Sequence, residues 1–444
     1  MPRLGIATLG IACFISLLRV TASAQDSSSN PRVSYADVLA HPDDPAINLR
    51  WANTQVANGD LKGAAATLER ILLIDPEQPT VRLFYAVVLY RLDSLAEAGE
   101  QFHALDKVPM DAAARQEIDD YLQRIAAKQR ANGFTAVGAL GFQYDTNRNL
   151  APTGIAPVSV TPALFAGPRT PDFGLIALGS LGVHHDLGFQ ERDELTADVT
   201  VYDDTQARVK SLNTEAATAR VGAVWRPDFA TVTTNLVATG LWLGSPSQFY
   251  YQGLGANVRA ERTLDALDRR VTLFADATAL DEIFHTVRID PMAGESTGGR
   301  YVLELGANYR AAAGVTLSAA WQGQIKSAES AVDAYYGNNG VLGATWIFAP
   351  GQYLQGIVQY GDFPYRGSDP LIKPAVTRED MIFDGRATYG LGLDTLFGTG
   401  GPGDVLIGLS WSVSVEDIHD QSTLATFTNN DVRVLTLLTK RLDF

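Results

Sequence analysis

Cysteine is almost absent from this chain of 444 residues, and the one that occurs is Cys13. Cys13 lies in a leader that we expect to be removed, so the mature chain should form no disulfide and offer no thiolate to a metal. No stretch after the leader holds the roughly 18 consecutive apolar residues that a transmembrane helix requires. Basic residues are scarce, with 35 Lys and Arg against 50 Asp and Glu. This acidic balance argues against nucleic acid as a partner.

The leader, residues 1–24, has the three parts of a secretory signal peptide. Arg3 gives it a basic start, residues 4–18 are mostly apolar, and Ala22-Ser23-Ala24 offers small residues for cleavage. We therefore expect an exported protein, in which residues 25–42 form an N-terminal linker or cap.

Residues 43–110 contain two similar segments at a spacing of 34 residues, which is typical of tetratricopeptide repeats. The turn between the first two helices is expected at Asn58-Gly59-Asp60, because Gly tolerates a positive φ there. Small residues should lie where the helices touch, and a Pro should follow each second helix, with Pro109 one residue out of register. The expected repeat-packing residues are Ala52, Gly59, Ala64, Leu68, Pro76, Ala86, Ala98 and Phe102.

Two repeats need further helices, because each repeat buries its apolar face only against a neighbour. Residues 111–131 place Ile118, Leu122 and Ile125 on one helical stripe. We predict a short all-α tetratricopeptide-like domain over residues 43–131, in which this last helix is a cap. The alternative is that the exposed helical face binds a partner.

After Asn132 the apolar period changes to the two-residue period of a β-strand. Tyr301, Leu303 and Leu305 alternate with more polar positions, and residues 405–415 alternate in the same way with serines on one face. Apolar residues on one face, polar residues on the other and aromatic residues near the ends are the pattern of a transmembrane barrel. Such a barrel crosses a bilayer with every backbone group paired between strands. The alternative is a soluble all-β protein, which alternates too.

Fourteen segments of this kind occur, an even number as expected for a single-chain bacterial barrel. If the helical domain is periplasmic, the odd-numbered connections are external, and the long ones (about 145–171, 281–298, 361–381 and 417–430) are all odd. Turns such as Pro227-Asp228 are short and even-numbered. We therefore predict an antiparallel β-barrel of about 14 strands over residues 132–444, in the outer membrane of a Gram-negative bacterium. The segments begin near residues 134, 172, 193, 213, 230, 248, 269, 299, 314, 333, 351, 382, 404 and 431.

The chain ends in a strand-like segment that closes on an aromatic residue. Leu442 and Phe444 fit the C-terminal signal by which outer-membrane barrels are recognised by their insertion machinery, although Thr439 stands where a Gly is usual and Lys440 interrupts the apolar face. We therefore expect that machinery and the lipids of the outer membrane as partners.

The junction between helices and barrel carries the most specific local sequence, GALGFQYDTNRNLAP. It resembles the barrel-opening motif of the surface lipoprotein assembly modifier (Slam) family, with Thr146 in place of Ser. From the residues alone, Asp and Asn side chains bond nearby backbone groups and tolerate turn conformations, so they can organise the exit from the first strand. Direct contact with cargo or with a cation is the alternative. The residues that match the family motif are Tyr144, Asp145, Asn147, Asn149 and Pro152.

The resemblance implies a function. Proteins of that family have periplasmic tetratricopeptide repeats and a fourteen-stranded outer-membrane barrel, and they help to export proteins to the cell surface. By this resemblance the chain would be a translocation component that receives a protein client, such as a surface lipoprotein, in the periplasm. Export of an exopolysaccharide is an alternative, because polymer-secreting barrels also carry such repeats. A passive porin and an outer-membrane enzyme are further alternatives.

Few residues suggest catalysis or metal binding. His184 and His185 are adjacent on an expected strand, where neighbouring side chains point to opposite faces, so they cannot both bind one ion. His285 lies near Asp281 and Glu282 at a long outer loop, and a solvated loop explains that cluster. No Gly-rich phosphate-binding loop follows a strand and opens a helix. We expect no enzymatic activity, no cofactor and no metal site.

Lumen composition should separate the two kinds of polymeric cargo. A sugar favours aromatic platforms and paired acids, whereas the expected lumenal positions Gln322, Gln324, Ser410 and Ser412 are only hydrophilic.

Overall fold

The computed structural model describes residues 35–41, 44–106, 108–128, 131–153, 168–189, 192–264, 269–397 and 406–444. The chain forms two compact units, a helical one that extends to Ala131 and a second one that runs from Asn132 to Phe444. The expected signal peptide, residues 1–24, lies outside the described residues. In the part of the chain that is described, no helix is long and apolar enough to cross a membrane.

The helical unit consists of consecutive short helices whose starts are set by local chemistry. The side chain of Asp44 accepts hydrogen bonds from the backbone of Ala46 and Ile47, and that of Asp60 accepts one from Gly63 at 2.9 Å, as N-cap residues do. Gly59 has φ +81° in the intervening turn. The helices are α1 (Tyr35–Ala40), α2 (Pro45–Ala57), α3 (Leu61–Ile74), α4 (Pro79–Arg91), α5 (Leu95–Ala104) and α6 (Ala112–Lys128).

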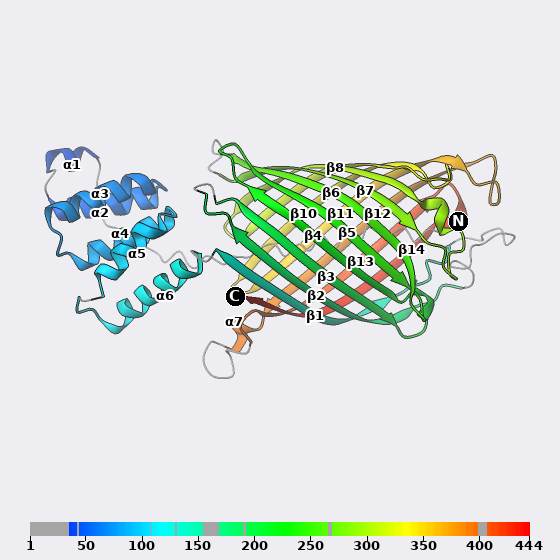
Figure 1. The fold of residues 1–444 in the computed structure, drawn as a ribbon, viewed down its shortest axis with the longest axis horizontal. Coiled ribbons are helices and arrows are strands. Elements are labelled where there is room, and N and C mark those ends of the chain that lie inside the picture. The colour runs from blue at the N-terminus through cyan, green and yellow to red at the C-terminus, as the bar shows by residue number, and fades with distance from the viewer. Residues whose placement is uncertain are drawn as a thin grey trace. The chain divides into compact units, whose positions relative to one another are not determined.

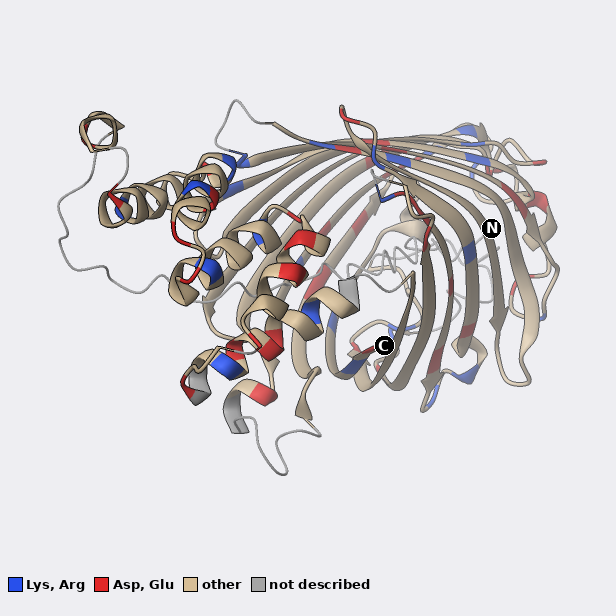
Figure 2. Cartoon of the chain, turned by 60° about the vertical axis from the view of Figure 1, so that its left-hand side comes forward, with Lys and Arg blue, Asp and Glu red and all other residues tan. Residues whose placement is uncertain are grey.

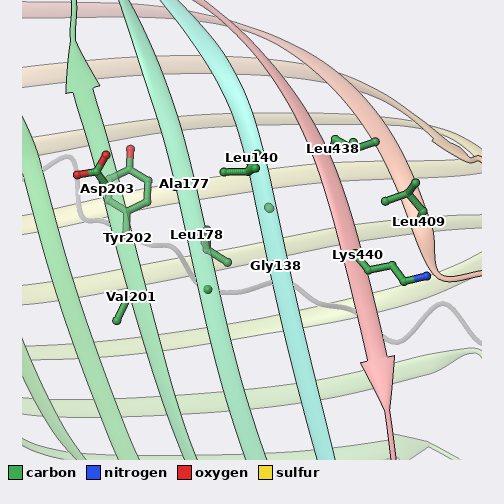
Figure 3. Close-up of a pocket in the computed structure, with 12 residues that line it drawn as sticks. Gly138, Leu140, Ala177, Leu178, Val201, Tyr202, Asp203, Leu409, Leu438 and Lys440 are labelled. Carbon is green, nitrogen blue, oxygen red and sulfur yellow. The ribbon is translucent and has the colours of Figure 1, made fainter. Parts of the chain in front are cut away.

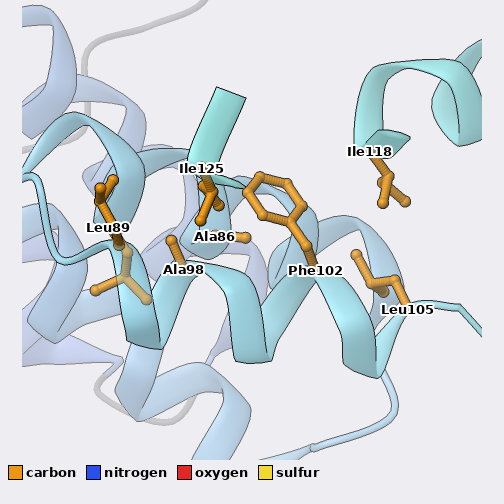
Figure 4. Close-up of a cluster of buried hydrophobic side chains, with 8 residues drawn as sticks. Ala86, Leu89, Ala98, Phe102, Leu105, Ile118 and Ile125 are labelled. Atoms are coloured by element: carbon orange, nitrogen blue, oxygen red, sulfur yellow. The ribbon is translucent and has the colours of Figure 1, made fainter. Parts of the chain in front are cut away.

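The small residues of the repeat lie where the helices touch. Ala52, Ala64, Ala86 and Ala98 are fully buried, and Leu68 and Phe102 are buried with them. Helix α4 belongs to two apolar clusters, because Leu89 packs with α5 and α6 and Val88 packs with α2 and α3. Figure 4 shows the ring of Phe102 among Ala86, Ala98 and Ile125. Pro76 follows the end of α3 at Ile74, and Pro109 precedes α6.

The second unit is a closed antiparallel barrel in which every strand pairs with its neighbours in sequence and β14 pairs with β1 (Figure 1). Closure leaves no unpaired strand edge. The strands are β1 (Asn132–Asp145), β2 (Asp172–Asp186), β3 (Glu194–Gln206), β4 (Thr214–Trp225), β5 (Thr231–Leu243), β6 (Gln248–Leu264), β7 (Val271–Phe284), β8 (Gly298–Ala312), β9 (Val315–Lys326), β10 (Tyr335–Ala349), β11 (Gln352–Ser368), β12 (Thr377–Gly392), β13 (Leu409–Ser422) and β14 (Asn429–Asp443).

The C-terminus takes part in the closure of the barrel. In the β1–β14 pairing, Asp145 lies opposite Arg433 and Thr135 lies opposite Asp443. Phe444 follows the last strand residue and exchanges backbone hydrogen bonds of 2.9 and 3.2 Å with Phe134. The side chains of Phe444 and Leu442 are exposed on the outside.

The outward face of the barrel is apolar, and exposed aromatic residues lie near both ends of the strands. Near the even-numbered turns these exposed residues include Phe134, Trp225, Tyr309, Trp346 and Phe444, and near the odd-numbered connections they include Phe142, Phe173, Tyr301, Trp321 and Tyr360. Two aromatic girdles around an apolar band are the surface of an outer-membrane barrel. The barrel is therefore of the outer-membrane type.

Two expectations about the strand ends are wrong. The thirteenth strand begins at Leu409, not near residue 404, because residues 406–408 form a turn in which Gly408 has φ +72°. At the odd-numbered end the strands are longer than predicted, since β11 extends to Ser368 and β13 to Ser422, and the connections are correspondingly shorter. The longest connection, 146–171, is odd-numbered, but 393–408 is a long even-numbered one.

Candidate functional site

The odd-numbered end of the barrel is covered by its own connections. Leu212, Leu424 and Phe427 are each 3% exposed and form one apolar cluster with Ile289 and other loop residues. The β7–β8 connection, which holds Ile289, lies halfway around the barrel from the connections next to the β1–β14 seam, so the connections must cross the mouth to meet. We call this cluster the loop cap. Its members are Leu150, Val209, Leu212, Ile289, Ile372, Val376, Leu424 and Phe427.

A row of ion pairs lines the inner wall next to the loop cap and continues across the β1–β14 seam. Arg433 lies 2.7 Å from Asp145 and 2.9 Å from Glu416. Arg148 lies 3.1 Å from Asp145 and 2.8 Å from Asp204. Asp145, Asp204 and Glu416 are nearly inaccessible to solvent, and buried charges of this kind persist only when they are paired. We call these residues, with Arg386 beside Glu416, the charge ladder.

A second ionic group on the opposite wall joins four strands. Glu282 of β7 accepts hydrogen bonds from Tyr251 of β6 at 3.0 Å and from Lys326 of β9 at 2.7 Å. Its carboxylate also lies 2.9 Å from Arg300 of β8. Glu282 is 1% exposed, so the expectation that it belongs to a solvated loop is wrong. Figure 2 marks the acidic and basic residues, which include both signs on neighbouring strands of the barrel.

The motif residues at the start of the barrel are placed where the first strand enters the loop cap. The Asn147 side chain donates to the backbone of Ala151 and Asn430, both at 3.0 Å, and accepts from Ala151 at 2.9 Å. Its backbone N–H donates to Asp431 of β14 at 2.8 Å. Asn149 donates to the carbonyl of Pro168 and accepts from Thr170, which connects the two ends of the β1–β2 connection.

The other motif residues have simpler surroundings. Tyr144 packs against Phe173 of β2, with ring centroids 4.7 Å apart. Pro152 lies in the described start of the β1–β2 connection, and residues 154–167 of that connection lie outside the described residues. Asp145, Asn147 and Asn149 thus bind the chain itself, and their polar groups hold β14, β1 and the start of the connection together.

Next to the loop cap the lumen holds a cavity of about 350 Å³, which we call the lumenal cavity. Leu150, Leu212 and Phe427 of the loop cap border it, as do Arg148 and Arg433 of the charge ladder. Charges of the two signs nearly balance, since four arginines and five aspartates line it. Its wall on β10–β13 carries residues that the sequence analysis did not single out, namely Tyr335, Phe363, Tyr365, Asp384 and Asp420.

The three histidines that the sequence placed near barrel strands lie beside ordinary protein groups. His185 contacts the side chain of Asn132 at 2.7 Å, while the ring of His184 lies against Gly133. His285 packs against the ring of Phe249, with centroids 4.8 Å apart. Within the described ranges, no group of three or more His, Cys, Asp or Glu residues is arranged to hold a metal ion.

A second hollow, of about 520 Å³, lies on the barrel wall over β1, β2, β3 and β14. Figure 3 shows Leu140, Ala177 and Leu438 around Gly138. A Cβ added at Gly138 would have no neighbour within 4 Å, and Leu140 beside it is 62% exposed. The hollow is thus an apolar part of the outward face that few side-chain atoms cover. The acyl chains of a bilayer would fill it.

Comparisons with known proteins found one matching family and several solved structures of low similarity. Residues 55–117 match the tetratricopeptide repeat family. Among solved structures, OccAB4 of Acinetobacter baumannii shares 8% identity over 72% of this chain and 100% of its own, with a TM-score of 0.33. OpdL of Pseudomonas aeruginosa shares 11% identity over 70% and 99%, with a TM-score of 0.33. The monoaromatic hydrocarbon channel TodX, as its deltaS2S3 mutant, shares 10% identity over 71% and 91%, with a TM-score of 0.36.

The search of curated proteins gave no match. The predicted fold class is confirmed, because the helices match the tetratricopeptide repeat family and the strands form a closed antiparallel barrel of 14 strands. The chain is an outer-membrane-type β-barrel preceded by tetratricopeptide-repeat helices.

Proposed function

We propose that this protein helps to export protein clients from the periplasm to the cell surface, as proteins of the surface lipoprotein assembly modifier family do. The helical unit would lie in the periplasm and receive the client, since the faces of repeat arrays can hold an extended peptide. The barrel would then provide a passage or a membrane-embedded wall for the client. The insertion machinery for barrels and the lipids of the outer membrane would be its other partners.

The observation that carries the proposal is the loop cap on a barrel that follows tetratricopeptide helices. A passive porin needs an open channel. In this barrel, connections that pack around Leu212, Leu424 and Phe427 cross the mouth. A covered mouth suits a lumen that opens only when a client is delivered. A passive porin has no evident need of helical repeats, so their presence also favours export of a client.

The junction motif supports the same proposal. Asp145 and Asn147 join β1 to β14 and to the start of the loop cap, so the residues that resemble the family motif lie where a movement of the cap would begin. We expect no enzymatic step and no cofactor. Binding of the client, and its folding outside the cell, would drive the transport.

A surface-shaved proteome tests the proposal. Intact cells with and without the gene are treated with protease, and the released peptides are quantified. We expect one or a few surface proteins to disappear from the surface and to accumulate in the periplasm. The full-length gene should restore them, while a variant that lacks residues 43–131 should not, although its barrel still assembles.

The matched control in this experiment is the amount of assembled barrel, measured by its mobility on a gel without heating. An unchanged protein surface in the deletion strain would contradict the proposal. Full restoration by the barrel alone would contradict the role given to the helices.

A further inference from the structure

We propose that the lumenal cavity is a binding site for a short, neutral saccharide. The inference goes beyond the proposed export of proteins and does not depend on it. One wall of the cavity, formed by the inward faces of β10, β11, β12 and β13, holds both aromatic rings and carboxylates.

The aromatic part of this wall is a cluster of three rings. Tyr335 and Phe363 are in edge contact, with centroids 6.0 Å apart, and Tyr335 and Tyr365 lie 5.2 Å apart. All three line the lumenal cavity and are only half-buried. Arg378 lies over the ring of Tyr365, 4.5 Å from its centroid, so Tyr335 and Phe363 are the rings that can offer surface to a ligand.

Two glycines leave room for the ring of Phe363 to lie against the wall of the cavity. A Cβ at Gly337 would come within 2.7 Å of the Phe363 ring, and a Cβ at Gly361 would also come within 2.7 Å of it. Any larger residue at either position would push the ring away from the sheet. One side of the ring thus lies against Gly337 of β10 and Gly361 of β11, and Phe363 lines the lumenal cavity, where a ligand could stack on it.

The polar part of the wall can accept hydrogen bonds. The pairing of the strands places Asp384 opposite Gln359 and Asp420 opposite Ile382, and both aspartates line the lumenal cavity. Gln359 donates to one oxygen of Asp384 at 2.7 Å. The other oxygen of Asp384 and one oxygen of Asp420 have no hydrogen-bond partner among the described residues. Both oxygens are almost inaccessible to solvent, so a ligand in the cavity would bond to other polar groups of the lining, such as the side-chain amides of Asn339 and Gln359.

Charge and size narrow the class of ligand. Because the arginines and aspartates of the lining nearly balance, the cavity favours a neutral polar molecule over a strongly charged one. A volume of about 350 Å³ lies at the small end of ligand pockets, which start at roughly 300 Å³, so a short saccharide fits and a folded domain does not. Sugars combine apolar C–H faces, which stack on aromatic rings, with hydroxyl groups that donate to carboxylates and amides.

Binding to the purified full-length protein in detergent tests the inference. The probes are maltotriose, cellotriose and chitotriose at millimolar concentration, followed by isothermal titration calorimetry. We expect at least one of them to bind. The variant Phe363→Ala removes the ring on which the sugar would stack, so it should weaken that binding by about tenfold. The variants Asn339→Ala and Gln359→Ala, which remove the side-chain amides, should weaken it too.

The matched control is Phe274→Ala, because Phe274 of β7 also lies against a glycine, Gly306, but does not line the lumenal cavity. It should bind the same sugar as the wild type does. The inference is overturned if none of the three sugars binds or if all variants bind equally. It is also overturned if spermidine binds in their place and loses affinity in the variants Asp384→Asn and Asp420→Asn, since the site would then be one for cations. None of these results would change the surface proteome, so the proposal on protein export is tested separately.

Discussion

The guanidinium group of Arg433 on β14 lies 2.7 Å from the carboxylate of Asp145 on β1, two residues that are 288 positions apart in the chain. The last strand and the first are therefore joined by an ion pair as well as by their backbone hydrogen bonds. Arg433 also contacts Glu416 of β13 at 2.9 Å, so the pair links three strands at the end of the barrel that carries the loop cap.

We predict that Arg433→Ala strongly destabilises the barrel. The variant leaves the buried carboxylates of Asp145 and Glu416 without this partner, and breaking a buried ion pair costs about 3–5 kcal/mol. The control is Arg441→Ala at the other end of β14, because Arg441 pairs with the exposed Asp443 and an exposed pair contributes about 0–1 kcal/mol. Unfolding in guanidinium, followed by gel mobility without heating, measures both. Equal midpoints for the two variants would refute the role of the seam pair.

A second prediction concerns Asn147. Asn147→Ala removes three side-chain hydrogen bonds to the backbone of Ala151 and Asn430, and each buried group left without a partner costs about 1–3 kcal/mol. We expect the start of the β1–β2 connection to loosen while the barrel stays closed. Limited proteolysis of the protein in membranes should then cut this connection faster. An unchanged rate of cleavage would contradict this role of Asn147.

The loop cap gives a third prediction. Phe427→Ala removes a ring that is 3% exposed at the centre of the cap, and truncation of a buried Phe costs about 3–5 kcal/mol. We expect the connections to separate and the ion conductance of the protein in a planar bilayer to rise. Phe142→Ala, which removes a ring from the outward face, is the control and should not change the conductance. A wild-type conductance already equal to that of Phe427→Ala would show that the cap does not close the lumen.

The fourth prediction tests the packing of the repeats. Ala64→Leu inserts a larger side chain at a fully buried contact between helices, and overpacking of this kind costs about 1–3 kcal/mol. Ala66→Leu lies on the exposed side of the same helix and is the matched control. Circular dichroism of the full-length protein at the helical band should show an earlier thermal transition for Ala64→Leu alone. An unchanged transition would mean that Ala64 is not tightly packed.

The strands and helices were largely predictable because their signals are local. Ala52 and Ala86 mark the repeat by spacing alone, and the alternation around Tyr301 requires only the two-residue period of a strand. The same local rule failed at residues 406–408, which continue the alternating pattern but form a turn before β13. Alternation shows which residues can pair, but hydrogen bonds to neighbouring strands decide where pairing begins.

The candidate site was less predictable because its residues are brought together by closure of the barrel. Phe363 and Asp420 lie on β11 and β13 and meet the cavity only through the register of the strands. The family motif pointed to Asp145, but no local sequence pattern marked its partner Arg433. A sequence signal for the aromatic wall does exist, because Tyr335 and Phe363 lie on the inward positions of strands where polar residues are expected.

The residue pattern alone is enough to predict a barrel preceded by helical repeats. That result follows from periodicity, since a chain without a long apolar run crosses a bilayer only as a closed sheet whose backbone groups pair with one another. The folded barrel, by contrast, is needed to bring Ile289 into the cluster of Phe427 across the mouth and to pair Asp145 with Arg433 across the seam. These contacts depend on closure and register, which place residues from opposite ends of the chain next to each other.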